Sequence, residues 1–136
     1  MKTVFADTAY HIAVLNPRDG LHEKAVSVSK ELGPIRIITS EMVLTELLAS
    51  FAGMGEQLRK AAAKYAESLL ANPNVEVVPQ TSMQFREALT GYEERRDKAW
   101  SLVDCASFQI MEERHLIEAL TSDHHFVQAS FAALLR

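Results

Sequence analysis

The chain has 136 residues, 48% hydrophobic and 24% charged, which fits one folded domain over residues 1–136 and excludes a largely disordered chain. The net charge of −4 argues against a plainly basic nucleic-acid-binding surface. No apolar stretch approaches the ~20 residues of a membrane span, and the first ten residues, MKTVFADTAY, hold no signal-peptide core, so we expect a cytoplasmic protein with no membrane partner.

Short apolar strands alternate with amphipathic helices along the whole chain, and Gly and Pro residues mark the breaks between them. In chain order the pattern predicts strand 2–6, helices 8–15 and 21–32, strand 35–38, helices 41–52 and 56–71, strand 75–78, helices 82–95 and 102–114, strand 117–120, a helical turn 124–129 and a short last strand 131–135. This alternation predicts an α/β fold with a mainly parallel sheet of four to five strands, covered by helices on both faces.

Two carboxylates stand directly behind predicted strands. Asp7 follows the strand 2–6, and Asp123 in the stretch TSDHHF follows the strand 117–120. In parallel sheets covered by helices, ligands bind beyond the carboxyl ends of the strands. Both residues therefore belong to the edge where a functional site is expected.

Two further acids lie in apolar surroundings. Glu46 lies inside VLTELL, and Asp104 lies inside SLVDCA. Burying an isolated carboxylate is costly unless it is paired, hydrogen-bonded or bound to a metal. The four acids together predict one site for a hard cation, Mg²⁺ or Mn²⁺, with one or two ions. If four of the 18 acidic residues form that site, the other 14 balance the 14 Lys and Arg residues, so the acidic charge does not exclude a phosphate substrate.

Each acid also has a simpler explanation. Asp7 and Asp123 can cap the helices that follow them. Asp104 stands three residues after Ser101, as in a capping box. Glu46 can face water at the edge of its helix. Caps and metal ligands are not exclusive, because a carboxylate at a helix start still has a free oxygen. The single cysteine, Cys105, excludes an internal disulfide and a Cys-based zinc site.

Four segments carry a resemblance to a known family. They are VFADTAYHIAVLNPRDGLHEKA, IITSEMVLTELL, DKAWSLVDCASFQIMEER and ALTSDHHFVQASF. Together they resemble the PIN-domain ribonucleases, especially the VapC-like toxins, over nearly the whole chain and least around residues 54–80. The resemblance implies a three-layer α/β/α fold and RNA cleavage that depends on Mg²⁺ or Mn²⁺.

By position, the family's acidic quartet falls on Asp7, Glu46, Asp104 and Asp123, as catalytic residues and metal ligands. The resemblance gives Thr8 and Thr121 supporting roles at the same site. Ser130 is a departure, because relatives usually have Gly there, and it leaves the turn before the last strand open to question.

The expected function is that of a metal-dependent endoribonuclease, a hydrolase acting on phosphodiester bonds. The resemblance also implies the toxin role of a toxin–antitoxin pair, with a small antitoxin partner and a homodimer. The main alternative is a catalytically inactive PIN-like module that binds RNA or protein. A phosphohydrolase with Asp7 as nucleophile is disfavoured, because Ala9 stands where its second Asp would be.

A basic run lies just before the helix that carries Asp104. Arg95, Arg96 and Lys98 are candidate RNA-binding residues, with a solvated charge run as the alternative. Nearby, Trp100 is expected to pack in the core, although base stacking is conceivable, and Asp97 is expected to be solvated or salt-bridged. Arg59, Lys60 and Lys64 are expected on a helix surface. His124 and His125 are expected to be polar surface residues or to lie just outside the metal site.

Overall fold

The computed structural model describes residues 1–136, and every predicted element is present. The strands are β1 (Lys2–Ala6), β2 (Ile35–Ser40), β3 (Val75–Val78), β4 (Glu118–Leu120) and β5 (Ala132–Ala133). The helices are α1 (Thr8–Leu15), α2 (His22–Leu32), α3 (Glu41–Phe51), α4 (Glu56–Ala71), α5 (Ser82–Glu94), α6 (Leu102–Glu113) and α7 (His124–Gln128). No helix is both long and apolar enough to cross a membrane.

The five strands form one parallel sheet in the order β3-β2-β1-β4-β5. The chain first builds outward from β1 through β2 to β3, and then returns to place β4 and β5 on the other side of β1. The strand order therefore reverses between β1 and β4. In open α/β sheets, ligands bind beyond the carboxyl ends of the strands at such a reversal.

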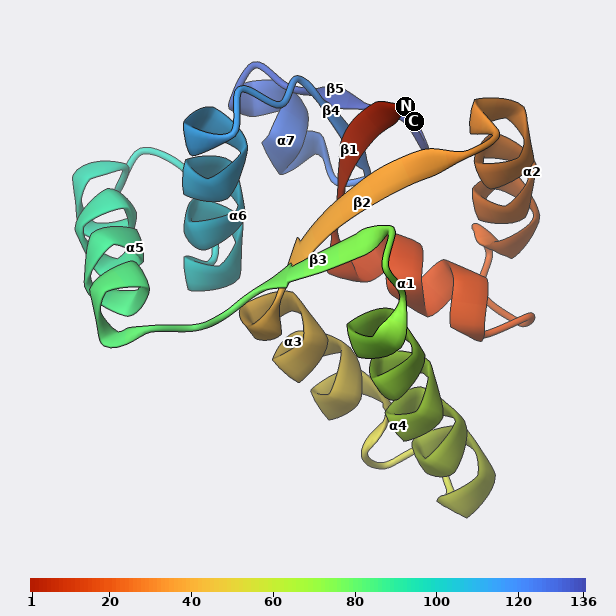
Figure 1. The fold of residues 1–136 in the computed structure, drawn as a ribbon. Coiled ribbons are helices and arrows are strands. Elements are labelled where there is room, and N and C mark those ends of the chain that lie inside the picture. The colour runs from red at the N-terminus through yellow and green to blue at the C-terminus, as the bar shows by residue number, and fades with distance from the viewer.

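Helices cover both faces of the sheet, as predicted (Figure 1). Successive side chains of a strand point to opposite faces. Accordingly, Val4 and Ala6 pack with residues of α1 and α2, whereas Phe5 packs with Phe108 of α6 and Phe126 of α7. These two apolar clusters make the chain a three-layer α/β/α structure.

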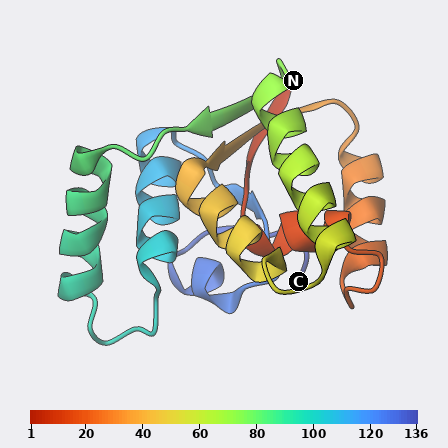
Figure 2. The same ribbon diagram turned by 90° about the horizontal axis from the view of Figure 1, so that it is seen from below.

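The helices α3 and α4 form a pair that extends away from the sheet (Figures 1 and 2). Leu44, Leu47 and Phe51 of α3 pack against Ala62 and Leu69 of α4 in a third apolar cluster. Ser40, the last residue of β2, caps α3 by accepting a hydrogen bond from the backbone N–H of Val43 at 3.1 Å. The first turn of α3 thus begins at the same sheet edge as Asp7.

The backbone conformation of the turn before β5 explains why glycine would suit position 130. Ser130 has φ of 72°, in the left-handed region. A residue with a side chain is disfavoured there by roughly 1–2 kcal/mol relative to glycine. The turn forms nevertheless, because the backbone N–H of Phe131 donates to the Phe126 carbonyl at 3.0 Å and that of Ala132 donates to the Ile117 carbonyl at 2.9 Å.

Candidate functional site

Asp7 and Asp123 follow neighbouring strands at the reversal of the sheet. Ala6 at the end of β1 stands opposite Leu120 at the end of β4. The backbone N–H of Asp7 donates to the Leu120 carbonyl at 3.2 Å, which extends the pairing one residue beyond β1. The pairing of two parallel strands therefore sets Asp7 beside the segment from Thr121 to Asp123.

Asp7 is a buried acid, only 5% exposed. Burial raises its pKa from 3.8 to about 7, partly offset by hydrogen bonds from the Thr8 backbone and the Thr121 side chain. The negative charges of Asp104 and Glu46 raise it further, which places both within electrostatic reach of Asp7. The Thr121 hydroxyl donates to Asp7 Oδ2 at 3.0 Å, and no Lys or Arg forms an ion pair with this carboxylate.

Asp104 serves two purposes at the start of α6. It completes a capping box, in which the Ser101 hydroxyl accepts from the Asp104 backbone N–H at 3.0 Å and Asp104 Oδ2 accepts from the Ser101 backbone N–H at 3.1 Å. The same Oδ2 lies 3.0 Å from His125 Nδ1. The capping explanation therefore holds, and the carboxylate is still only 7% exposed and turned toward α7.

Asp123 also combines a cap with a position in the cluster. Its Oδ1 accepts from the backbone N–H of His125 at 2.9 Å, which caps α7. Its own backbone N–H donates to the Thr121 hydroxyl at 3.1 Å, and that hydroxyl donates to Asp7. Thr121 therefore bridges Asp7 and Asp123. The sequence had shown only that both residues follow the ends of strands.

His125 contacts both Asp104 and Asp123. Its Nδ1 lies 3.0 Å from Asp104 Oδ2 and 3.4 Å from Asp123 Oδ1. Asp123, His124 and His125 also offer ligand atoms that all lie within 4.8 Å of one another. The sequence placed these histidines on the surface or just outside the metal site, and the contacts of His125 fit the second position. The motif DHH was visible in the sequence, but the rotation of the short helix α7 was not.

Glu46 occupies a different environment. It is exposed on α3 and forms no side-chain hydrogen bond or ion pair. It therefore faces water, which was the simpler explanation for this residue. Its charge nevertheless acts on Asp7. Glu46 therefore borders the aspartate cluster without being packed into it.

Thr8, directly after Asp7, has a buried hydroxyl with no hydrogen-bond partner. Buried polar groups in folded proteins are nearly always satisfied. An unpartnered hydroxyl beside a buried acid that lacks a counter-charge fits a site that takes a further polar species.

The basic run is partly committed to internal contacts. Arg95 donates to both carboxylate oxygens of Asp97, at 3.1 and 3.3 Å, and lies over the ring of Trp100 at 4.7 Å. Asp97 is thus salt-bridged. Arg96 is only 3.9 Å from Glu93 with a side chain that is 82% exposed, and Lys98 forms no ion pair. Arg59, Lys60 and Lys64 are exposed residues of α4.

Comparison with known proteins supplies a family and a related fold. The model of the PIN domain family matches residues 4–132. A solved structure of Mycobacterium tuberculosis VapC20, described as a toxin that cleaves the sarcin–ricin loop, superposes with a TM-score of 0.83 at 24% identity, covering 95% of this chain and 96% of that one. Among curated protein sequences, none matches the chain.

Proposed function

The chain belongs to the PIN domain family, and on that premise we propose that it is a divalent-metal-dependent endoribonuclease whose site is formed by Asp7, Glu46, Asp104 and Asp123. The observation that carries the proposal is the buried Asp7 carboxylate. It lies at the reversal of the sheet, has no cationic side-chain partner, and is bridged to Asp123 by Thr121. A structural acid in such a position would be expected to have a counter-ion from the protein.

The residues fit a hard divalent cation, Mg²⁺ or Mn²⁺. Carboxylate oxygens predominate among the side-chain donors, as these ions prefer. A cation would supply the counter-charge that Asp7 lacks, and the unpartnered hydroxyl of Thr8 fits a site with another polar species. Asp7, Asp104 and Asp123 would hold one or two ions, with Glu46 at the border. When bound, such ions activate water and stabilise the leaving oxygen of a phosphodiester.

The other polar residues would position the carboxylates. The Thr121 hydroxyl orients Asp7 and holds the backbone of Asp123. The Ser101 backbone N–H fixes Asp104, and His125 keeps Asp104 and Asp123 on the same side of α7. Outer-shell partners of this kind affect metal affinity by roughly 10–100-fold when they are lost. We therefore assign Thr8 and Thr121 supporting roles.

Substrate and partners follow from the family and the related fold. We propose RNA as the substrate and a toxin role in the cytoplasm with a small antitoxin as partner, by analogy with the toxin whose fold the chain shares. A homodimer and a single PIN domain over residues 1–136 complete the proposal. Among the candidate RNA-binding residues, Arg96 and Lys98 are freer than Arg95 to contact phosphates, because Arg95 is bound to Asp97.

The test is cleavage of end-labelled single-stranded RNA in the presence of Mg²⁺ or Mn²⁺ and in EDTA. The expected result is internal cleavage with metal, none in EDTA, and none for Asp7→Asn with metal. Glu67→Gln is the matched control, since Glu67 is an exposed acid on α4 with no side-chain partner. Cleavage that persists in EDTA or in Asp7→Asn would overturn the proposal, and RNA binding without cleavage would favour an inactive binding module.

A further inference from the structure

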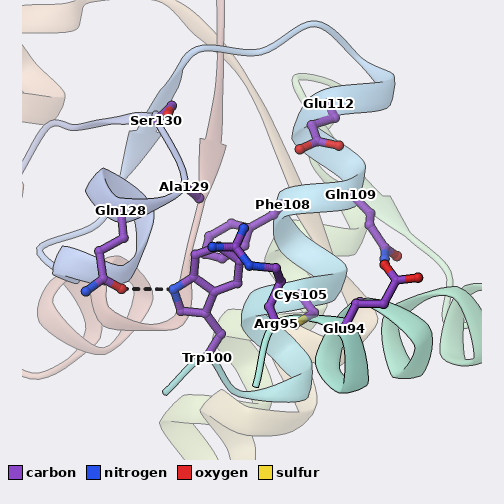
Figure 3. Close-up of a pocket in the computed structure, with 11 residues that line it drawn as sticks. Glu94, Arg95, Trp100, Cys105, Phe108, Gln109, Glu112, Gln128, Ala129 and Ser130 are labelled. Carbon is purple, nitrogen blue, oxygen red and sulfur yellow. Dashed lines mark hydrogen bonds between the residues drawn. The ribbon is translucent and has the colours of Figure 1, made fainter. Parts of the chain in front are cut away.

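A cavity of about 320 Å³ lies between α5, α6 and the end of α7 (Figure 3). Its volume is within the range of roughly 300–1,000 Å³ that small-molecule sites occupy. The residues that give it chemical character are Glu94, Arg95, Trp100, Gln109, Glu112 and Gln128. None of them belongs to the proposed metal site.

The cavity lies close to the aspartate site along two elements. Trp100 precedes the N-cap of α6, and Cys105, which follows Asp104, lines the cavity. Two contacts join the start of α6 to α7: His125 Nδ1 with Asp104 Oδ2 at 3.0 Å, and Trp100 Nε1–H donating to Gln128 Oε1 at 3.0 Å. His125 and Gln128 are three residues apart on α7, a rise of about 4.5 Å. A nucleotide next to a phosphate at the metal site could therefore reach the cavity.

One wall holds an aromatic ring and a guanidinium, the two kinds of group on which bases stack. The Arg95 guanidinium lies 4.7 Å from the centroid of the Trp100 ring. Trp100 is held by Gln128 and by edge-on packing against Phe108 at 4.9 Å, and Arg95 is held by Asp97. Unpaired RNA bases stack on aromatic rings and on arginine planes.

The free polar groups of the cavity include two carboxylates as acceptors and the side-chain amide nitrogen of Gln128 as a donor, because only the amide oxygen of Gln128 has a partner. The carboxylates of Glu94 and Glu112 form no ion pair or side-chain hydrogen bond, although both line the space. Gln109 Nε2 donates to the Glu87 carbonyl at 2.8 Å, and its Oε1 is buried with no partner. Two carboxylates disfavour a phosphate group in this cavity and favour a ligand with N–H donors.

Guanine is the nucleobase whose edges match this set. Its N1–H and N2–H₂ groups are adjacent donors that a carboxylate can accept together. Adenine, cytosine and uracil each place a ring acceptor or a carbonyl beside their single donor group, which a carboxylate repels.

We propose that this cavity is a subsite for an unpaired guanine of the RNA, next to the phosphate that is cleaved. Trp100 and Arg95 provide the stacking surface, and Glu94 and Glu112 provide the acceptors. The proposal rests on the proposed ribonuclease function, because that function puts RNA at the neighbouring aspartates.

The chain contains a single tryptophan, Trp100, so its fluorescence reports directly on the cavity. GMP, AMP, CMP and UMP are titrated into the wild-type protein in EDTA, where no metal can capture the nucleotide phosphate. We expect saturable quenching by GMP, with an affinity about tenfold higher than for the other three, the size of one good base contact. Absence of quenching, or equal affinity for all four nucleotides, would overturn the proposal.

Two double variants, which change the net charge equally, test whether the Glu94 and Glu112 carboxylates accept hydrogen bonds from the base. Glu94→Gln with Glu112→Gln alters the cavity, whereas Glu93→Gln with Glu113→Gln makes the same charge change on exposed neighbours that do not line it. If the carboxylates only repel an anion, both double variants should bind GMP more tightly. We expect instead a loss of about tenfold in the first and none in the second.

The two proposals can fail separately. GMP binding in EDTA needs neither metal nor cleavage, so absent quenching in a protein that still cleaves RNA would remove the guanine subsite and leave the ribonuclease. Selective GMP quenching in a protein that does not cleave RNA would leave a guanine-binding cavity and remove the catalytic assignment.

Discussion

Two buried titratable side chains, Asp7 at the N-cap of α1 and His11 within that helix, have different surroundings. His11 is fully buried and both ring nitrogens have partners: Nδ1 is 2.8 Å from the Tyr65 hydroxyl, and Nε2 is 3.1 Å from the Thr39 hydroxyl. Because the Thr39 hydroxyl donates to the Ala6 carbonyl at 2.9 Å, it accepts from Nε2–H, so the Tyr65 hydroxyl donates to Nδ1. Asp7 is nearly as buried but lacks any counter-charge.

The contrast separates a polar group whose hydrogen bonds are complete from the one that we propose holds a metal. Burial lowers the pKa of His11 to about 3, so the ring is neutral and its hydrogen bonds are complete. Burial raises the pKa of Asp7 to about 7, so its charged form is unstable without a cation. A side chain with complete hydrogen bonds needs no further ligand, whereas a buried carboxylate without a counter-charge marks the position where we propose that a cation binds.

The largest expected effect is on catalysis. Asp7→Asn should reduce metal-dependent RNA cleavage by more than the ~100-fold that loss of an outer-shell partner costs, because an amide is a poor ligand for a hard cation. The measurement is single-turnover cleavage at saturating Mg²⁺, with folding checked by circular dichroism. A folded variant with normal cleavage would remove Asp7 from the site.

His11→Leu should lower stability and leave cleavage largely intact, the reverse of what we expect for Asp7→Asn. It leaves the Tyr65 hydroxyl without its acceptor and removes a donor from Thr39, so we expect a loss of about 2–3 kcal/mol in the free energy of unfolding. Cleavage, measured at a temperature where the variant is folded, should stay within a few-fold of wild type. A stable variant that is inactive would show that His11 belongs to the catalytic machinery.

The dependence of stability on pH should distinguish the two residues by sign. The unfolded chain protonates His11 near pH 6.5 and the folded chain only near 3. Its stabilising contribution is therefore complete above pH 6.5 and should fall by about 2 kcal/mol between pH 6.5 and 5. The contribution of Asp7 is complete below 3.8 and is lost as the pH rises toward 7. Denaturant unfolding of wild type, His11→Leu and Asp7→Asn in EDTA would separate them, and equal pH profiles would contradict both assignments.

Glu46 provides a smaller test at the border of the site. Because Glu46 is exposed and reaches Asp7 only through its charge, Glu46→Gln should reduce cleavage by about tenfold, at the low end for an outer-shell partner. Apparent Mg²⁺ affinity, taken from the metal dependence of the cleavage rate, should fall in parallel. A loss as large as that of Asp7→Asn would make Glu46 a direct ligand.

The smallest effect concerns the fold alone. Ser130→Gly should raise the free energy of unfolding by up to about 1 kcal/mol, because glycine adopts the left-handed conformation without strain but loses more entropy on folding. Thermal unfolding of the variant measures the effect. Destabilisation would mean that the Ser130 side chain makes a contact that offsets the strain.

Hydrophobic periodicity predicted the elements well because each strand and helix is short and bounded by Gly, Pro or a capping residue. The last strand is shorter than expected, at Ala132–Ala133, although Leu134 and Leu135 continue the backbone bonding toward β4. Strand-tip positions also predicted that Asp7 and Asp123 share an edge, because parallel strands end together.

The features that the sequence did not predict depend on side-chain orientation and on contacts between distant parts of the chain. The position of His125 between Asp104 and Asp123 follows from the rotation of α7, which Phe126 sets by packing against Phe5 and Phe108. No local pattern contains that information. Likewise, Tyr65 reaches His11 across 54 residues of sequence, and nothing near either residue predicts the contact.

The central claim is that a divalent cation completes the Asp7 site, and the free energy of unfolding at pH 8 with and without Mn²⁺ tests it most directly. In EDTA, Asp7→Asn should be more stable than wild type, because it removes a buried charge without a partner. At Mn²⁺ concentrations about 100 times the dissociation constant, wild type should gain about 2.7 kcal/mol and the variant much less. The difference in the free energy of unfolding between the two proteins should therefore narrow or change sign. Equal stabilisation of both proteins by Mn²⁺, or of neither, would contradict the account.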